Sequence, residues 1–356
     1  MQPNKESENR YEEVFGLTFS MYSKEEFLEF MHPFVVRFER NGLDPRAMFE
    51  GKTCLDAGCG NGRGSLFMLS NGAAHVSCFD YSATNVESAT RFLTEFGYDN
   101  FDTALGSLEQ LPFPDQHFDF VWCNGVLMHT KRPNACLDEI TRVLKVGGRS
   151  WQYLYGAGGV YWRVIHHLRE MMKPVQVQTC IDHLKLYRYE TRYLAEYIDD
   201  WFASHLRTYT IEDMRRAYLT RGYGEVLLLP HGMDYDTSHR RNKATSDLEL
   251  DYMGEGDLRW LLTKDEHGKT EGFQLNEGEY GSNYQWPKCM GEVDSIFKAA
   301  AAEAMPAWAR VAMAARIQRQ LRIMLYDQTG SFDLKTFLDY TKESIGLAQK
   351  LSAGQS

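Results

Sequence analysis

The sequence lacks the features that mark membrane, secreted and zinc-binding proteins. No apolar run approaches the ~18 residues that a membrane helix needs. The N-terminus, MQPNKESENRYEE, is polar and has no apolar core of a signal peptide. The seven cysteines occur without C-x-x-C pairs. We therefore expect a cytoplasmic protein without membrane association, with buried free thiols and no metal site.

The chain also has little positive charge. Lys and Arg number 39 against 49 Asp and Glu, so the formal net charge is -10. Nucleic-acid binding depends on clustered Lys and Arg that contact phosphates. This balance predicts that nucleic acid is not a partner. The length of 356 residues is enough for one large core with an extension, or for two domains.

Short apolar runs alternate with helical segments in the first half of the chain. The expected strands cover residues 53–57, 75–79, 118–122 and 150–154, and the expected helices cover 65–69, 83–96 and 136–144. A further helix and strand are expected at 210–221 and 225–229. Such alternation predicts an α/β fold with a mostly parallel sheet covered by helices on both faces.

The remaining segments divide the chain into five parts. Ser23 and Glu26 form a plausible capping box, which predicts the start of an N-terminal helix. An apolar stripe within residues 293–326 predicts packing on the core or a homodimer formed through the C-terminal helices. The expected parts are an N-terminal helical cap (1–44), a core (45–155), a lid insertion (156–205), the last helix–strand unit of the core (206–232) and a mainly helical C-terminal extension (233–356).

The sharpest signal is a glycine loop that follows the first expected strand. From Asp56 to Gly62 the sequence has the spacing D-x-G-x-G-x-G. A glycine loop between a strand and a helix lets a ligand approach the backbone closely. The dinucleotide-binding pattern G-x-G-x-x-G would need a glycine at position 63, where the chain has Arg63.

This loop resembles the first motif of the class I S-adenosylmethionine-dependent methyltransferases. Asp80 ends the second expected strand, where this family keeps an acidic residue. Residues 106–113, GSLEQLPF, resemble the family segment G-D-A-E-x-L-P-F, with Ser107 in place of Asp. Residues 137–148, LDEITRVLKVGG, resemble L-x-E-x-x-R-V-L-K-P-G-G. The resemblance covers about residues 52–155.

The resemblance implies a Rossmann-like fold with seven strands and a defined cofactor site. S-adenosylmethionine would be the cofactor and S-adenosylhomocysteine its product. Asp56 would interact with the aminoacyl part, and Asp80 would accept hydrogen bonds from both ribose hydroxyls. Ser107 would accept from the adenine amino group more weakly than Asp. The expected cofactor-binding residues are Asp56, Gly58, Cys59, Gly60, Asp80, Tyr81, Ser107, Leu108, Glu109 and Asn124.

The expected reaction requires few catalytic side chains. Methyl transfer from a sulfonium requires alignment of donor and acceptor and the exclusion of water. A base is needed only when the acceptor must lose a proton. His129 is the candidate base, because imidazole titrates near neutral pH; packing or a cofactor contact is the other interpretation of this residue. The expected acceptor-binding residues are Met128, Tyr155, Tyr161, Trp162, His166 and Trp201, with core packing of the aromatic ones as the alternative.

The motifs are most similar to the branch of the family that acts on metabolites and natural products. We therefore expect methyl transfer to an N, O or S atom of a small-molecule acceptor. Three alternatives stay open: a cyclase or lyase that uses the same cofactor without methyl transfer, a protein or peptide methyltransferase, and a cofactor-binding module without turnover.

Overall fold

The computed structural model of the chain comprises two compact units, which are described separately. The structure describes residues 10–244, 246–265, 272–278, 290–301, 305–326 and 332–353. The sheet unit consists of Met1–Gly156, Ser204–Met233 and Asp257–Asn283. The helical unit consists of Ala157–Ala203, Asp234–Gly256 and Tyr284–Ser356.

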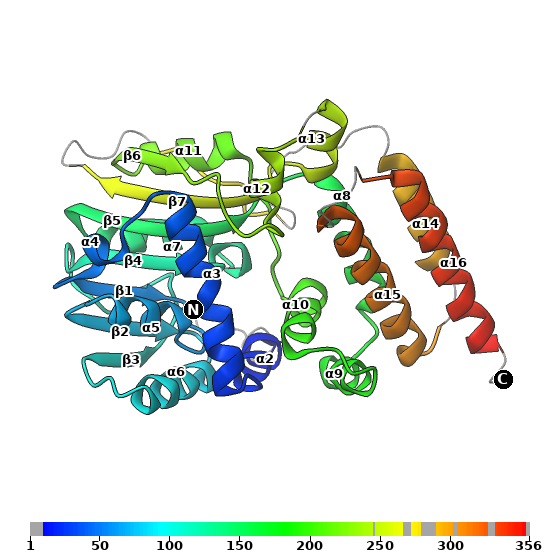
Figure 1. The fold of residues 1–356 in the computed structure, drawn as a ribbon, viewed down its shortest axis with the longest axis horizontal. Coiled ribbons are helices and arrows are strands. Elements are labelled where there is room, and N and C mark those ends of the chain that lie inside the picture. The colour runs from blue at the N-terminus through cyan, green and yellow to red at the C-terminus, as the bar shows by residue number, and fades with distance from the viewer. Residues whose placement is uncertain are drawn as a thin grey trace. The chain divides into compact units, whose positions relative to one another are not determined.

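The sheet unit contains a seven-stranded, mostly parallel sheet, which confirms the predicted fold class (Figure 1). Its strands are β1 (Thr53–Ala57), β2 (His75–Asp80), β3 (Phe101–Leu105), β4 (Phe118–Asn124), β5 (Leu144–Tyr155), β6 (Tyr223–Leu228) and β7 (Asp257–Lys264). The order is β3-β2-β1-β4-β5-β7-β6. Strands β1 to β5 pair in parallel, and β7 runs antiparallel to both β5 and β6. The strand order reverses direction between β1 and β4, where open α/β sheets bind their ligands.

Two of these strands are absent from the sequence predictions. β3 is an edge strand with mostly half-exposed residues, so it has no continuous apolar run. β7 falls within the range assigned above to a C-terminal extension outside the core, yet it is buried between β5 and β6. Residues 233–356 therefore contribute to both units.

Helices cover both faces of the sheet, as expected. The helical segments of this unit are η1 (Glu12–Gly16), α2 (Leu17–Ser20), α3 (Lys24–Arg40), α4 (Pro45–Phe49), α5 (Arg63–Ser70), α6 (Ala83–Glu95), η2 (Leu127–His129), α7 (Pro133–Val143) and α11 (Ile211–Leu219). One core cluster joins α3 to α6 with the sheet, around the stacked rings of Trp122 and Trp151, 5.0 Å apart. The other joins α7 and α11 with the opposite face, around Ile140, Tyr218 and Trp260.

Local signals set the helix boundaries where the sequence predicted them. The Ser23 side chain accepts a hydrogen bond from the Glu26 N–H, and the Glu26 side chain accepts from the Ser23 N–H. This reciprocal pair confirms the predicted capping box at the start of α3. At α6, the Ser82 side chain caps the helix by accepting from the Asn85 N–H.

The helical unit packs eight described helices, joined by buried polar contacts. They are α8 (Gly159–Met172), α9 (Val177–Leu186), α10 (Thr191–Phe202), α12 (Thr237–Arg241), α13 (Asp247–Met253), α14 (Met290–Ala301), α15 (Ala307–Tyr326) and α16 (Leu334–Ala353). Gln318 of α15 donates to Asp200 Oδ2 of α10 at 2.6 Å. Arg163 of α8 makes a bidentate pair with Asp294 of α14. Such planar pairs fix the mutual position of two helices.

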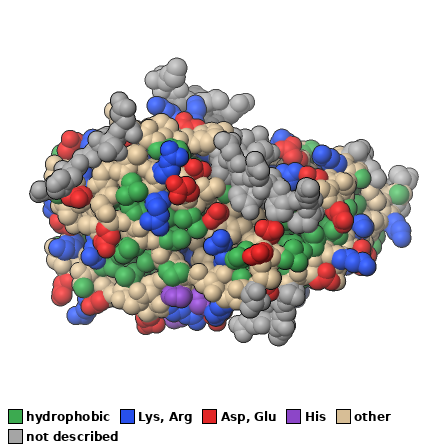
Figure 2. Space-filling view, turned by 90° about the horizontal axis from the view of Figure 1, so that it is seen from above, with side chains coloured by type: hydrophobic (Ala, Val, Ile, Leu, Met, Phe, Trp, Pro, Cys, Tyr) green, Lys and Arg blue, Asp and Glu red, His purple; other side chains and the backbone are tan. Residues whose placement is uncertain are grey.

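Three further observations concern the surface charge, membrane-spanning helices and the cysteines. On the face in Figure 2, Lys and Arg side chains are interspersed with Asp and Glu. Among the helices that the structure describes, none combines the length and apolar character needed to cross a membrane. Six cysteines are buried and free, as predicted, and Cys289 lies outside the described residues.

Candidate functional site

The glycine loop between β1 and α5 has a backbone that side chains would not tolerate. Gly58 and Gly60 have φ values of +85° and +53°. A Cβ atom on Gly58 would lie 2.5 Å from a methyl group of Val126, and one on Gly60 would lie 3.3 Å from the ring of Phe19. Glycine is therefore required here both for the backbone conformation and for the close approach of neighbours.

Asp80 fixes this loop at the carboxyl end of β2. Its Oδ2 accepts a hydrogen bond from the Gly60 N–H at 2.8 Å, and its Oδ1 accepts from the Ser82 N–H at 2.9 Å and from Asn85 Nδ2 at 3.2 Å. Burial raises the pKa of Asp80, and these hydrogen bonds oppose that shift by favouring the carboxylate. A carboxylate oxygen accepts two hydrogen bonds. Oδ2 therefore has the capacity to accept from a ligand hydroxyl as well as from the loop.

Asp56 lies under the loop, in β1. Its side chain is 2% exposed, and its Oδ2 accepts from the Ser65 hydroxyl at 2.7 Å. The same hydroxyl accepts from the Cys78 thiol at 3.1 Å. Burial raises the pKa of Asp56 to about 7, against the opposing effect of the Ser65 bond. The predicted contact with the aminoacyl part of a cofactor stays a prediction.

The segment after β3 lies beside Asp80 and contains the predicted adenine contacts. The Gly106 N–H donates to the backbone carbonyl of Asp80 at 2.9 Å. The Ser107 hydroxyl accepts from the Glu109 N–H at 3.2 Å, which closes a tight turn and leaves Leu108 buried. A hydroxyl oxygen has two acceptor positions, so this turn does not exhaust Ser107.

A partly buried ion pair on α7 holds the rest of this segment in place. Glu139 accepts from Arg142 through both carboxylate oxygens at 2.8 Å, and it also accepts from the Leu111 N–H at 2.7 Å. Arg142 donates in turn to the carbonyls of Leu111 and Phe113. The hydrogen bond from Arg142 holds the pKa of Glu139 below its usual range. The pair thus positions the loop that follows the predicted adenine contacts.

Three other predicted cofactor residues have identifiable contacts. The Cys59 N–H donates to the carbonyl of Phe79 at 3.0 Å, which anchors the loop to β2. Asn124 Oδ1 accepts from Trp151 Nε1 at 3.0 Å. The ring of Tyr81 meets the ring of Tyr11 edge-on at 5.3 Å. These contacts keep the residues near the loop, and their roles in cofactor binding stay predictions.

Residues 11–20 form an N-terminal cover over the loop; the sequence offered Tyr11 as a possible acceptor-facing residue, whereas Glu12, Phe15 and Phe19 are not among the predicted site residues. Glu12 Oε1 accepts from the Thr84 N–H at 3.0 Å, at the start of α6. The ring of Phe19 lies against Gly60, and the ring of Phe15 lies 5.1 Å from the ring of His129. The spacing of Tyr11, Phe15 and Phe19 at every fourth residue is a helical stripe, which indicates an apolar helix face but not which residues that face covers.

His129 lies in η2, on the loop after β4, and is 4% exposed. Its Nδ1 is 2.9 Å from the backbone oxygen of His205. Because a carbonyl oxygen only accepts, Nδ1 carries the proton, and Nε2 holds the lone pair when the ring is neutral. Tyr155 meets the ring edge-on at 5.6 Å, on the side of the carboxyl end of β5. The structure therefore brings together two predicted residues, His129 and Tyr155, and adds Phe15.

The remaining predicted acceptor residues are placed differently. Met128 is fully buried in the core of the sheet unit. The other four belong to the helical unit: Tyr161, Trp162, His166 and Trp201. There, Tyr161 donates to Asp200 at 2.6 Å, and Trp201 donates to Gln318 at 2.6 Å. Trp162 packs edge-on against Tyr161 at 5.1 Å, and burial lowers the pKa of His166 to about 3. Their roles in acceptor binding stay predictions.

Arg207 stabilises the loop that carries His129. The buried guanidinium donates to the carbonyl of Thr130, and to those of Glu277 and Gly278 at 2.9 and 3.0 Å. The Arg207 N–H donates to the carbonyl of Met128 at 3.1 Å. One side chain thus connects the loop after β4 with the segment around residue 277.

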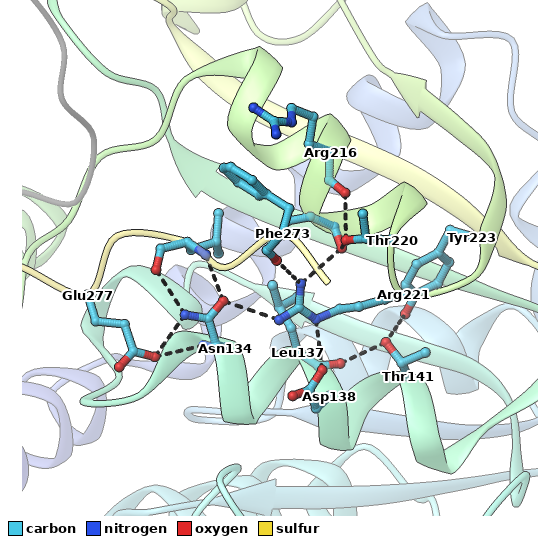
Figure 3. Close-up of polar contacts among 12 residues, drawn as sticks. Asn134, Leu137, Asp138, Thr141, Arg216, Thr220, Arg221, Tyr223, Phe273 and Glu277 are labelled. Carbon is cyan, nitrogen blue, oxygen red and sulfur yellow. Dashed lines mark hydrogen bonds and ion pairs between the residues drawn. The ribbon is translucent and has the colours of Figure 1, made fainter. Parts of the chain in front are cut away.

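A second arginine attaches the same segment to α7 and α11 (Figure 3). Arg221 donates to Asp138 Oδ1 at 2.9 Å, to Asn134 Oδ1 at 3.2 Å and to the carbonyl of Phe273 at 3.2 Å. Asn134 bonds both the N–H and the carbonyl of Leu275, at 2.8 and 2.9 Å. No signal in the sequence pointed to this arrangement, because its partners are far apart along the chain.

Comparison with known proteins gives a family for the central segment. Residues 55–151 match the family described as "Methyltransferase domain". A tRNA U34 carboxymethyltransferase of Campylobacter curvus is 32% identical over 108 residues, which are 30% of this chain and 36% of that protein. A ubiquinone biosynthesis O-methyltransferase of Maricaulis maris is 30% identical over 156 residues, 39% of this chain and 61% of that protein. The YcgJ protein of Bacillus subtilis is a structural neighbour with a TM-score of 0.40 and 20% identity, over 64% of this chain and 99% of that chain.

The properties of the curated relatives are not transferred to the whole chain, because only part of each of them is matched. One prediction is also contradicted. The chain spans about a third of the length of the first curated relatives that it matches. Three of these relatives, 32 to 34% identical, are named for a tRNA nucleotide. The exclusion of nucleic acid as a partner was therefore wrong. It rested on a charge summed over the whole chain, whereas phosphate recognition depends on where cations cluster.

Proposed function

Starting from a chain that carries a class I S-adenosylmethionine-dependent methyltransferase domain, we propose that it transfers the cofactor's methyl group to an N, O or S atom of a small-molecule acceptor. The observation that most directly supports this proposal is the hydrogen bond from the Gly60 N–H of the glycine loop to the carboxylate of Asp80, at the carboxyl end of β2. The match to the methyltransferase family covers this same segment.

The described residues fit the cofactor. The carboxylate of Asp80 would accept from the ribose hydroxyls, and the close backbone at Gly58 and Gly60 would face the aminoacyl part. The buried segment around Leu108 would line the adenine. An ionised Asp56 would favour the positive charge of the ligand. When bound, the cofactor supplies a methyl group activated by its positively charged sulfur.

The residues around His129 suit an acceptor that must be oriented and kept from water. The ring of Phe15 lies tilted at 5.1 Å from the imidazole, and that of Tyr155 meets it edge-on at 5.6 Å. His129 is 4% exposed, so water is largely excluded from its surroundings. Nε2 is the nitrogen that takes a proton from an alcohol or ammonium acceptor. For an acceptor without such a proton, His129 orients the acceptor and has no catalytic step.

A nucleic-acid acceptor is the second candidate, and it is favoured by the tRNA names of three curated relatives. We place the small molecule first because the rings of Phe15 and Tyr155 lie 5.1 and 5.6 Å from the His129 ring, and small-molecule sites are lined mainly by apolar and aromatic side chains. The six free, buried cysteines agree with action in the cytoplasm, where thiols stay reduced.

The test is to incubate the full chain with methyl-deuterated S-adenosylmethionine and cell extract, and to analyse the small-molecule, RNA and protein fractions by mass spectrometry. We expect label in one small metabolite, and much less label with Asp80→Ala at a limiting cofactor concentration. Label in RNA would replace the small-molecule proposal with the second candidate, and label in protein would overturn both. Cofactor consumed without transfer of the label would refute methyl transfer itself.

A matched pair of histidine variants then tests the base. His129→Gln should lower kcat and remove the acidic limb of the pH profile if the acceptor loses its proton to Nε2. His32→Gln, at an exposed position of α3, is the control and should match the unchanged protein. An unchanged pH profile in His129→Gln would assign His129 to orientation alone.

A further inference from the structure

The N-terminal cover lies between the glycine loop and solvent. The ring of Phe19 is 3.3 Å from the place that a Cβ atom on Gly60 would take, and Gly60 is buried whereas Phe19 is partly exposed. The carbonyl of Phe19 accepts from Asn61 Nδ2 at 3.5 Å. Asn61 and Asp80 are 1% and 4% exposed. Because these groups are so well buried, a ligand reaches them only after the cover has moved.

One carboxylate attaches the cover to α6, the helix that follows Asp80. Glu12 Oε1 accepts from the Thr84 N–H at 3.0 Å and from the Thr84 hydroxyl. Thr84 lies in the first turn of α6, where backbone N–H groups have no acceptor within the helix and negative charge is favoured. Hydrogen bonds to a charged acceptor are also roughly twice as strong as neutral ones. This contact therefore stabilises the closed position of the cover.

The backbone of the cover is shaped for the contact with α6. A Cβ atom on Gly16 would lie 2.8 Å from Ser82 Oγ, the cap of α6, and 3.0 Å from Glu12 Cδ. Glycine thus lets η1 approach the start of α6 closely. η1 is itself a five-residue π-helix, a rare form of helix that is frequent at functional sites. The close packing brings the Glu12 carboxylate within reach of Thr84.

A short connection joins the cover to α3. The helical part of the cover is capped by Met21, and α3 begins at Lys24 with its own capping box. Tyr22, in the connection, is 7% exposed and meets the ring of Phe30 edge-on at 5.0 Å. Hinges are commonly a few residues at the ends of elements, which absorb changes in φ and ψ. Rotation of the backbone at Met21 therefore turns the cover while Tyr22 and α3 stay in place.

We propose that the N-terminal cover is hinged at Met21, and that Glu12 is the positioning residue that holds it closed through Thr84. The open cover admits S-adenosylmethionine and releases S-adenosylhomocysteine. The closed cover places Phe15 beside His129 and Phe19 against Gly60. This inference rests on the proposed function, because it takes the cofactor as the ligand of the glycine loop.

The test measures the rates at which S-adenosylhomocysteine binds to and leaves the immobilised full chain, by surface plasmon resonance. Glu12→Ala should raise both rates about tenfold, the factor expected for the loss of hydrogen bonds to a charged group. The dissociation constant should stay within about twofold, because a contact made by the closed cover with or without ligand does not favour either state. A residue that only shapes the site would raise the dissociation rate alone.

Matched variants separate this contact from a general loosening of the N-terminus. Glu12→Gln keeps an acceptor oxygen without the charge, so its rates should lie between those of the unchanged protein and Glu12→Ala. Thr84→Val removes one donor and should raise both rates by a smaller factor. Glu13→Ala, at an exposed position of the same helix, is the control and should change neither rate.

Hydrogen exchange supplies a second measurement that needs no ligand. Residues 11–20 should exchange faster in Glu12→Ala than in Glu13→Ala, while residues 53–57 of β1 should exchange equally in both. Binding with unchanged rates in Glu12→Ala, or a faster dissociation with weaker affinity, would overturn the role of Glu12 and leave the proposed function in place. A chain that binds no S-adenosylhomocysteine at all would overturn both.

Discussion

Replacing Asp56 by Asn should stabilise the sheet unit, and the gain should grow as the pH rises. The Asp56 carboxyl is 2% exposed and accepts from the Ser65 hydroxyl at 2.7 Å. Asparagine keeps an acceptor oxygen for Ser65 and cannot ionise. The variant therefore mimics the protonated acid, which burial favours.

The size and sign of the effect follow from the pKa. Burial raises the pKa of Asp56 from 3.8, the ordinary value, to about 7. A raised folded-state pKa means that the favourable contribution is fully present below the unfolded value and is lost as the pH rises through the folded value. About three pH units at ~1.4 kcal/mol each give an upper limit of ~4 kcal/mol by pH 8. Near pH 5 the same difference is roughly 1–2 kcal/mol.

Hydrogen exchange measures this in the sheet unit alone. Peptides covering residues 53–70 would be followed by mass spectrometry in urea at pH 5, 6.5 and 8. Asp119→Asn is the control, because the bond from Lys145 and the Thr53 N–H outweigh burial and lower the pKa of Asp119. Its stabilising effect is present above the unfolded value of 3.8, so that variant should lose stability by a constant amount across this range. An advantage of Asp56→Asn that does not change with pH would refute the reasoning.

Three further changes test the cofactor site. Asp80→Ala should weaken S-adenosylmethionine binding by about 2–3 kcal/mol in calorimetry, because it removes the ionised acceptor; unchanged affinity in a folded protein would remove Asp80 from the site. Ser107→Asp should bind the cofactor equally well or more tightly, and a large loss would show that the adenine pocket is built differently. Gly58→Ala should lower the thermal midpoint through a loss of more than about 2 kcal/mol, because its Cβ would lie 2.5 Å from Val126. A midpoint within 1 °C of the unchanged protein would contradict that last expectation.

The parts of the fold that the sequence predicts are those set by local pattern. β1, β2 and β4 are buried on both faces of a parallel sheet, so each is a short apolar run bounded by turn residues. The capping box at Ser23 depends on two residues three positions apart, so it is visible without the fold. The glycine loop and Asp80 were predictable for the same reason, since their order along the chain is their identifying feature.

The parts that the sequence does not predict depend on distant partners. β7 pairs with β5 on one side and with β6 on the other, so its position in the sheet depends on two strands distant in sequence. The eight residues of β7 do not by themselves indicate these partners. The Asn134 side chain bonds the backbone of Leu275, 141 residues away. The cover formed by Phe15 and Phe19 likewise depends on contacts with His129 and Gly60 across the fold. Periodicity shows that such apolar residues share one face of a helix, but it does not show which residues that face contacts. Those contacts follow only from the tertiary structure.

The failed exclusion of nucleic acid has the same physical origin. The net charge of -10 would act on a partner only at long range. Salt screens surface charges beyond the Debye length of about 8 Å, so this long-range effect is weak. Within that distance, only neighbouring groups count. Residues 239–243, His-Arg-Arg-Asn-Lys, place three permanent cations within five positions of an acidic chain. Partners of this protein are therefore to be inferred from the charged groups within a few ångströms of each site, and the total charge alone does not exclude any of them.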